Sequence, residues 1–236
     1  GGFATHVVVP GRGLCRVDEA ALAEAGIELA TLSVIADAVS TPYQAILNAG
    51  LRAVDLAIFV GIGCVGAFGV QLAKALGATV IAIDIDEERL GRTRGAALCV
   101  DAKGDARAIK KQVQGFAKQE GLRPTGWKIF ETSGHPAGQE LAFSLLGHDG
   151  HLGVVGFTMD KVTIRLSNLM AFDATARGTW GCLPEHYPAI LDLVLAGKVE
   201  LGPFVEQHPM SHINEIFEAL RRHEMKLRPV LVPDFN

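Results

Sequence analysis

The fold is decided by the stretch Leu56-Ala-Ile-Phe-Val-Gly-Ile-Gly-Cys-Val-Gly66. Its first five residues are apolar and predict a buried strand, and the three glycines that follow predict a tight turn that opens a helix. Within such a turn, Gly61 permits the sharp change of direction, Gly63 lets the backbone come close to a pyrophosphate, and Gly66 lets the helix pack against the strand. The alternative is a glycine-rich turn that binds no ligand.

The helix that follows this turn is expected to begin near Cys64 and Val65. Its first backbone N–H groups and the positive end of its dipole would face the same pyrophosphate. Residues 56–73 contain no charged side chain, and this run reaches the lower limit of length for a membrane-spanning helix. Four glycines interrupt the run, so a buried strand, turn and helix explain it better. We therefore expect no membrane association.

The succession of one strand and one helix repeats along the central part of the chain. Most of the expected strands are continuous apolar runs, which is typical of parallel strands that helices cover on both faces. Right-handed connections between such strands predict a doubly wound α/β sheet, the Rossmann fold. The expected strands are 56–60, 79–83, 97–100, 127–130, 151–155 and 175–181, and the expected helices are 64–76, 86–94, 105–119 and 137–146.

Both ends of the chain depart from this alternation. The elements expected there are short strands at 3–9, 14–17 and 229–232 and helices at 18–38, 188–196 and 211–222. We expect a dinucleotide-binding domain over residues 38–185, while residues 1–37 and 186–236 would form parts of a second domain that the chain leaves and re-enters. At the start of the dinucleotide domain, Thr41-Pro42 has the hydroxyl cap and the proline of a helix N-terminus.

Asp84 stands at the end of the second expected strand, 18 residues beyond Gly66. A carboxylate at this place accepts hydrogen bonds from the ribose hydroxyls of adenosine and would repel a 2′-phosphate, which favours NAD over NADP. The alternative role is a helix N-cap, for which Asp86 is better placed because an acidic first turn follows it. Arg89 could tolerate a phosphate, but we give Asp84 more weight and count both side chains as candidates for cofactor binding.

Two further strand ends should border the same crevice, because ligands of open α/β sheets bind at the carboxyl ends of the strands. The segment Glu131–Gly134 follows the fourth expected strand and would lie near the adenine, with Thr132 and Ser133 as the candidate cofactor contacts. Val155, Gly156 and Phe157 come at the end of the fifth strand and would lie near the nicotinamide. Either set could instead form a simple turn between a strand and a helix.

The composition is that of an ordinary globular protein, with 49% hydrophobic and 20% charged residues. The net charge of -4 argues against a nucleic-acid-binding surface, which needs a basic face. The four cysteines lie far apart and form no Cys-x-x-Cys pair, which argues against a structural zinc knuckle in this chain. Nothing indicates a disulfide framework either, so we expect a reducing compartment, the cytoplasm.

Together these motifs resemble the zinc-dependent medium-chain alcohol dehydrogenase family over essentially the whole chain. The matching pieces are Gly1–Pro10, Asp37–Tyr43, Gly61–Gly66, Asp84, Thr132–Gly134, Val155–Gly156 and His208–Phe217. The resemblance implies that a β-rich, GroES-like catalytic domain comes first and that the chain returns to it after the dinucleotide domain. It also implies oxidation of a secondary alcohol to a ketone by hydride transfer to NAD, with Thr41 near the nicotinamide.

The same resemblance implies a zinc ion, which would hold the substrate alkoxide and lower the pKa of the alcohol. Most of the family's zinc ligands belong to a region that would precede Gly1, and only the position of Asp37 is covered. A carboxylate oxygen is a legitimate zinc donor, although from the residues alone Asp37 could equally be an exposed side chain at a helix end. Because the chain opens with Gly1 inside an expected strand, we expect it to be the C-terminal part of a longer protein.

A narrower resemblance is to 6-hydroxycyclohex-1-ene-1-carbonyl-CoA dehydrogenases. The segments that carry it are Val155–Lys161, Arg165–Phe172 and Gly178–Pro184. It implies a cyclic hydroxyacyl-CoA substrate in the anaerobic degradation of aromatic compounds, and no feature of composition or spacing bears on that substrate. Lys161, Arg165 and Arg177 could meet the phosphates of CoA, but solvated surface charges are the simpler account.

Three other interpretations stay open. A zinc-free reductase of the same superfamily would lack an acid at position 37 and use NADP, so Asp37 and Asp84 both argue against it. A non-catalytic NAD-binding module would need neither the opening strand nor the re-entrant tail. A fragment could bind NAD without turning over substrate. In the complete protein we expect a small-molecule substrate and a homo-oligomer.

Overall fold

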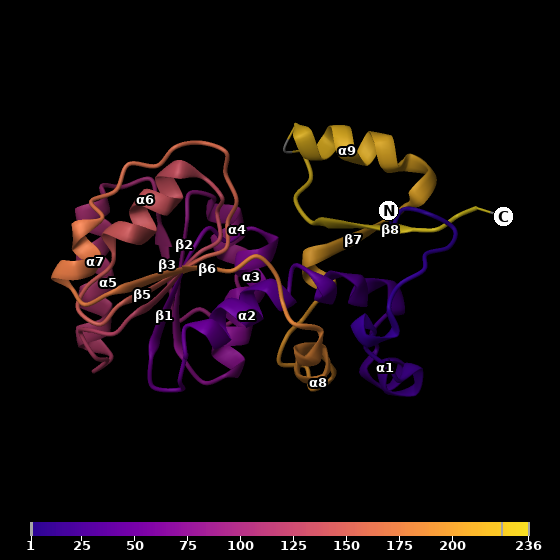
Figure 1. Cartoon of the computed structure of the whole chain (residues 1–236), viewed down its shortest axis with the longest axis horizontal. Coiled ribbons are helices and arrows are strands. Elements are labelled where there is room, and N and C mark those ends of the chain that lie inside the picture. Colours follow the sequence, from indigo (N-terminus) through magenta and orange to yellow (C-terminus); the bar gives the residue numbers. More distant parts are fainter. Residues whose placement is uncertain (1, 223, 236) are drawn as a thin grey trace. The chain divides into compact units, whose positions relative to one another are not determined.

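The computed structural model describes residues 2–222 and 224–235. The chain divides into two compact units (Figure 1), which we call the central unit, Thr41–Gly181, and the outer unit, Gly1–Ser40 with Cys182–Asn236. The central unit begins after residue 40, where the sequence predicts a boundary after residue 37. It ends at residue 181, where the sequence predicts an end at residue 185. That the outer unit belongs to a catalytic domain stays a prediction.

The central unit is built on one six-stranded sheet in which every pair of neighbouring strands is parallel. Its strand order is β3-β2-β1-β4-β5-β6, so the direction of winding reverses between β1 and β4. The strands are β1 (Leu56–Val60), β2 (Thr79–Asp84), β3 (Leu98–Asp101), β4 (Lys128–Glu131), β5 (His151–Val154) and β6 (Thr175–Gly178). This topology confirms the expected doubly wound α/β fold.

Helices connect the strands and cover the sheet (Figure 1). They are α2 (Ser40–Asn48), α3 (Cys64–Ala75), α4 (Glu87–Arg92), α5 (Ala106–Gln119), α6 (Pro136–Ser144) and α7 (Ser167–Ala171). The charge-free run at 56–73 is confirmed as a strand, a turn and a helix. Within the described part of the chain, no helix is long and apolar enough to cross a membrane.

Side chains that alternate along the strands supply the core on both faces of the sheet. Ile58 of β1 lies beside Ile129 of β4 in the register of the two strands. Both belong to one buried cluster with Ile109 and Val113 of α5. The next residue of β1, Phe59, points to the opposite face, and there it meets α3. The central strands β1 and β2 are therefore buried on both sides, as their continuous apolar sequences require.

The outer unit contains short helices and one small parallel sheet of β7 and β8. Its regular elements are α1 (Glu19–Ala25), α8 (Tyr187–Leu195), α9 (Ile213–Arg221), β7 (Val205–Pro209), β8 (Arg228–Val232) and 3₁₀ turns at 11–13, 29–36, 184–186, 202–204 and 210–212. Of these, β7 was missed by the sequence analysis, because its residues combine two prolines at or near its ends with charged and polar side chains.

Two expectations about the N-terminal segment were wrong. Residues 3–9 and 14–17 are not strands, since they pair with no other strand in the described chain and are mostly exposed. The single helix expected at 18–38 is broken at Gly26, which adopts a left-handed conformation with φ +66° and ends α1. Glycine takes this conformation at little cost, so it commonly terminates helices, and a 3₁₀ helix follows at Leu29–Ala36.

The contact between α3 and β1 yields a stability prediction. A Cβ atom added at Gly69 would lie 2.3 Å from Cε1 of Phe59, and that ring cannot move freely because it stacks on Phe130 with ring centroids 4.7 Å apart. We expect Gly69→Ala to lower the free energy of unfolding by about 1–3 kcal/mol, the usual cost of overpacking a core. Urea denaturation would measure the change.

Gly115→Ala is the matched control, because Gly115 lies in the middle of α5 and a Cβ atom there meets nothing within 4 Å. Alanine at an open helical position should stabilise the protein by about 0.5–1 kcal/mol. If both substitutions shift the urea midpoint in the same direction, the proposed steric origin of the effect at Gly69 is wrong.

Candidate dinucleotide site

The glycine-rich turn between β1 and α3 is tight at its ends and open in its middle. Gly61 has φ +93°, and a Cβ atom there would lie 2.5 Å from the Cα atom of Ser133. At Gly66 a Cβ atom would lie 2.0 Å from the carbonyl oxygen of Gly61. At Gly63, by contrast, nothing lies within 4 Å of an added Cβ atom. The sterics thus require glycine at 61 and 66 for the fold, and leave space beside Gly63.

Gly63 is also the N-cap of α3 and provides no side-chain cap for that helix. The first turn of α3, which contains Cys64 and Val65, therefore offers backbone N–H groups and a positive dipole end to the space beside Gly63. A dinucleotide pyrophosphate is the kind of group that such a helix N-terminus binds. The geometry of the turn fits the cofactor that the sequence motif predicts.

Asp84 ends β2 and is only 5% exposed. One of its carboxylate oxygens accepts a hydrogen bond from the N–H of Ile62, inside the glycine-rich turn, and the other accepts one from the N–H of Asp86 at 2.9 Å. The carboxylate therefore holds the turn against the end of the neighbouring strand. It retains lone pairs for further donors, since an ionised carboxylate offers about four acceptor positions.

Asp86 is the N-cap of α4, as its position in the sequence suggests. Its side chain accepts hydrogen bonds from the N–H groups of Glu88 at 2.9 Å and Arg89 at 3.1 Å. The bond from Arg89 is the largest cause of a pKa of Asp86 below the usual value for aspartate. The Nε atom of Arg89 lies 3.5 Å from the same carboxylate, so this arginine, a predicted cofactor contact, interacts with the helix cap.

The end of β4 is fastened to the glycine-rich turn through Thr132. Its hydroxyl donates to the carbonyl oxygen of Gly61 at 2.6 Å and lies 3.1 Å from that of Val60. Ser133 follows and packs directly under Gly61. Both predicted residues therefore lie beside the turn, and they shape it whether or not they touch a ligand.

The end of β5 lies next to the end of β4. The N–H groups of Val155 and Gly156 donate to the carbonyl oxygen of Glu131 at 2.9 and 3.0 Å. Phe157 is 69% exposed. The structure thus brings the glycine-rich turn, Asp84, Thr132, Ser133, Val155 and Gly156 together at the carboxyl edge of the four strands β2, β1, β4 and β5.

The sequence predicts Glu131 only as the first residue of a segment that borders the crevice and gives its side chain no separate role, yet it is the last residue of β4 and fully buried. Its Oε1 atom accepts hydrogen bonds from the backbone N–H groups of Ser133 and Gly134 and from the Ser133 hydroxyl. The available signal was a carboxylate at the end of an apolar strand, two residues before a small polar residue, which resembles the spacing of Asp84 and Asp86.

Thr41 lies in the first turn of α2 and is buried, with 6% of its surface exposed. The expectation that it caps this helix was wrong, because α2 begins at Ser40 and Thr41 is already helical. Its place near a nicotinamide stays a prediction.

Asp37, the predicted metal ligand, belongs to the outer unit. Its Oδ2 atom accepts a hydrogen bond from Nη2 of Arg228 at 2.7 Å, and its side chain is 61% exposed. Among the residues that the structure describes, no three His, Cys, Asp or Glu side chains gather where they could hold a metal ion. The described chain therefore does not fit a complete zinc site.

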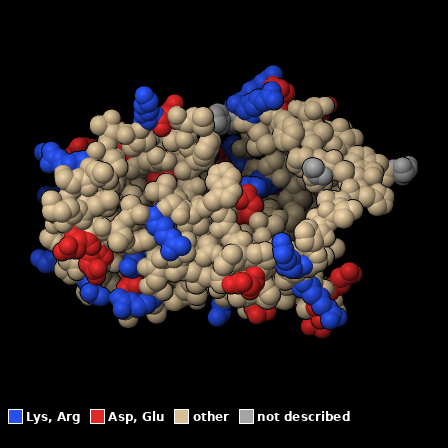
Figure 2. Space-filling view, viewed as in Figure 1, with Lys and Arg blue, Asp and Glu red and all other residues tan. Residues whose placement is uncertain are grey.

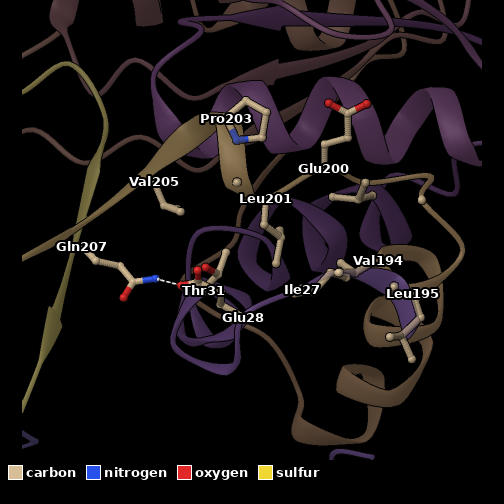
Figure 3. Close-up of a pocket in the computed structure, with 15 residues that line it drawn as sticks. Ile27, Glu28, Thr31, Val194, Leu195, Glu200, Leu201, Pro203, Val205 and Gln207 are labelled. Atoms are coloured by element: carbon tan, nitrogen blue, oxygen red, sulfur yellow. Dashed lines mark hydrogen bonds between the residues drawn. The ribbon is translucent and has the colours of Figure 1, made fainter. Parts of the chain in front are cut away.

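A pocket of about 790 Å³ lies within the outer unit (Figure 3). Its wall includes Glu28, Thr31, Leu201 and Gln207, and the Gln207 amide donates to the Glu28 carboxylate. None of the predicted site residues lines this pocket.

On the face seen in Figure 2, acidic and basic side chains are interspersed, without one large basic area.

Comparison with known proteins agrees with this geometry. Residues 64–196, more than half of the chain, match the family model described as zinc-binding dehydrogenase. An alcohol dehydrogenase of Geobacillus stearothermophilus is 26% identical over 98% of the chain and 64% of its own length. An L-threonine 3-dehydrogenase of Bacillus velezensis is 24% identical over 99% of the chain and 65% of its own length.

Solved structures show the same fold. The alcohol dehydrogenase of Aeropyrum pernix superposes with a TM-score of 0.72 at 30% identity, over 86% of this chain and 58% of that one. AibC superposes with a TM-score of 0.84 at 23% identity, over 100% of this chain and 63% of that one. The chain thus spans less than two thirds of the length of these relatives. On the family match and the fold, the chain belongs to the zinc-binding dehydrogenase family.

Proposed function

We propose that this chain binds NAD at the carboxyl edge of its parallel sheet and that the protein oxidises a secondary alcohol to a ketone by hydride transfer. The observation that carries the proposal is the space beside Gly63, at the N-terminus of α3, in a turn that Asp84 and Thr132 hold in place. The names of the relatives support the type of reaction, and an acetophenone reductase of the same fold was solved in complex with NAD.

Each part of the edge has a task in this proposal. The turn around Gly63 and the first turn of α3 bind the pyrophosphate through backbone N–H groups, and Asp84 accepts hydrogen bonds from the adenosine ribose. Val155, Gly156 and Phe157 border the nicotinamide, with Thr41 nearby. The cofactor accepts the hydride, while the protein positions it and shapes its surroundings.

The buried carboxylate of Asp84 also supports the choice of NAD over NADP. A 2′-phosphate would bring at least one further negative charge against a carboxylate that is fixed by two backbone N–H groups and cannot easily turn away. Arg89, the cation that could offset this repulsion, lies close to the carboxylate of Asp86.

For zinc, we propose Asp37 as one ligand, with the other ligands supplied by residues outside the described chain. A bound zinc ion acts as a Lewis acid toward the alcohol oxygen. Because Asp37 pairs with Arg228 and the described residues offer no full ligand set, we assign no step of the reaction to the metal. A chain that binds NAD without turnover is the alternative that this observation favours.

A cyclic hydroxyacyl-CoA of anaerobic aromatic degradation is the substrate that we propose, on the resemblance of the segments 155–161, 165–172 and 178–184. We also propose a homo-oligomer. Three large apolar side chains between residues 159 and 180 are strongly exposed: Met159 (87%), Met170 (76%) and Trp180 (91%). The cytoplasm is our proposed location, in keeping with four cysteines that are all free.

The substitution Gly63→Val tests whether the glycine-rich turn binds a ligand. The added side chain enters open space, so we expect a change of less than about 1 kcal/mol in the free energy of unfolding, as for ordinary exposed positions. The same side chain occupies the place of the pyrophosphate, so NAD affinity should fall at least about tenfold, the equivalent of 1.4 kcal/mol. Calorimetric titration with NAD, beside thermal unfolding, measures both quantities. Unchanged NAD affinity in the folded variant would argue for a turn without a ligand.

Asp84→Asn tests the ribose contact and the choice of cofactor. We expect NAD affinity to fall about tenfold, because a hydrogen bond to a charged acceptor contributes roughly 1.5–3 kcal/mol, and the preference for NAD over NADP to narrow. Calorimetry with both cofactors gives the two constants.

Asp55→Asn is the control for this variant. Asp55 is equally buried and also accepts a backbone hydrogen bond, from Arg52 at 2.9 Å, but it precedes β1 at the opposite edge of the sheet. It should lose stability without losing NAD affinity. A wild-type chain that is folded and binds neither cofactor would refute the proposed function.

A further inference from the structure

Glu131 has a hydrogen-bonding pattern that its place in the core does not require. All three donors that the structure assigns to its carboxylate converge on one atom, Oε1: the N–H of Ser133 at 2.7 Å, the Ser133 hydroxyl and the N–H of Gly134 at 3.2 Å. The other oxygen, Oε2, is buried and has no hydrogen-bond partner. A buried carboxylate oxygen without a hydrogen-bond partner costs folding free energy, so the fold alone gives little reason for an acid at this position.

The same residue joins the ends of two strands. Its side chain folds the turn that follows β4, and its main-chain carbonyl accepts the N–H groups of Val155 and Gly156 at the end of β5. Both turns border the crevice that we propose for NAD. Displacement of Glu131 would therefore affect the turn after β4 through the side chain and the end of β5 through the main chain.

Gly134 and Gly156, which lie close together in space, leave room for the Glu131 carboxylate and for the two turns. A Cβ atom at Gly156 would lie 2.6 Å from Oε2 of Glu131 and 2.2 Å from the nitrogen of Gly134. Gly134 itself has φ +64°, and a Cβ atom there would lie 2.7 Å from the carbonyl oxygen of Phe157. The carboxylate is enclosed by backbone on the side of β5, so its position and the course of both turns are mutually dependent.

The turn after β4 is in contact with the glycine-rich turn as well. Ser133, which donates twice to Glu131, lies directly under Gly61. The carboxylate of Glu131 thus contacts the turn after β4 directly, lies close to Gly156 after β5, and is linked to the glycine-rich turn after β1 through Ser133.

From this geometry we infer that Glu131 is a positioning residue for dinucleotide binding: its carboxylate fixes the turns after β4 and β5 in the spacing that the cofactor needs. The inference rests on the proposed function. It requires the charge of the carboxylate, because hydrogen bonds to an ionised acceptor are shorter and stronger than those to a neutral amide.

The test is Glu131→Gln, which keeps the shape of the side chain and removes its charge. We expect the dissociation constant for NADH, followed by the fluorescence of the bound cofactor, to rise about tenfold, since three charge-assisted bonds become ordinary ones. Ile129→Val and Ile129→Ala serve as a graded control. Ile129 is buried on the same strand and faces the core cluster, so these variants lower the melting temperature without touching the turns.

The inference predicts that Glu131→Gln weakens NADH binding more than an Ile129 variant of equal melting temperature does. Equal NADH affinity at equal melting temperature would reduce Glu131 to a structural role and overturn the inference. A wild-type chain that is folded yet does not bind NADH would instead overturn the proposed function, and this inference with it.

Ser133→Ala covers the case in which Glu131→Gln does not fold. It removes one of the three donors and leaves the two backbone donors in place, so the NADH dissociation constant should rise about threefold. If Glu131→Gln does fold, adding Ser133→Ala to it should have less effect than in the wild type, because the two side chains act through one hydrogen bond. An unchanged constant for Ser133→Ala would contradict the inference.

Discussion

The close approach of the Gly61 carbonyl to its neighbours is the constraint on which the central unit depends. This oxygen accepts the Thr132 hydroxyl and leaves no room for a side chain at Gly66. Three elements, β1, α3 and β4, therefore meet at one main-chain atom. Once they meet there, the N-terminus of α3 has to lie at the point where the strand order reverses, which is where open parallel sheets bind their ligands.

Two buried carboxylates flank this point. In the strand order β2-β1-β4, Asp84 ends the strand on one side of the glycine-rich turn and Glu131 ends the strand on the other. Both carboxylates accept hydrogen bonds from backbone N–H groups. Asp84 accepts them with both oxygens, whereas Glu131 accepts with Oε1 and its Oε2 has no hydrogen-bond partner. The edge that we propose for a diphosphate thus carries two buried carboxylates of its own.

The centre of the sheet could be predicted because β1 and β2 are apolar runs in the sequence, and their burial on both faces follows from that. In the outer unit, α8, α9 and β8 were predicted close to their observed bounds, but β7 was not, because Val205–Pro209 becomes a strand only by pairing with β8, which local pattern does not reveal. In the candidate site, the glycines and Asp84 were recognisable by spacing. The hydrogen bonds of Glu131 were not, because they arise from a turn whose conformation depends on Gly134 and Gly156 in three dimensions.

The ion pair of Asp37 with Arg228 joins residues 191 positions apart, and this has a consequence for biosynthesis. Residues 41–181 are contiguous, so every residue of the central unit has been made well before Arg228. The outer unit has to wait until β8 has been made, which takes on the order of 10–40 s at typical elongation rates. During that interval the first forty residues of the nascent chain lack the C-terminal segments with which they form the outer unit.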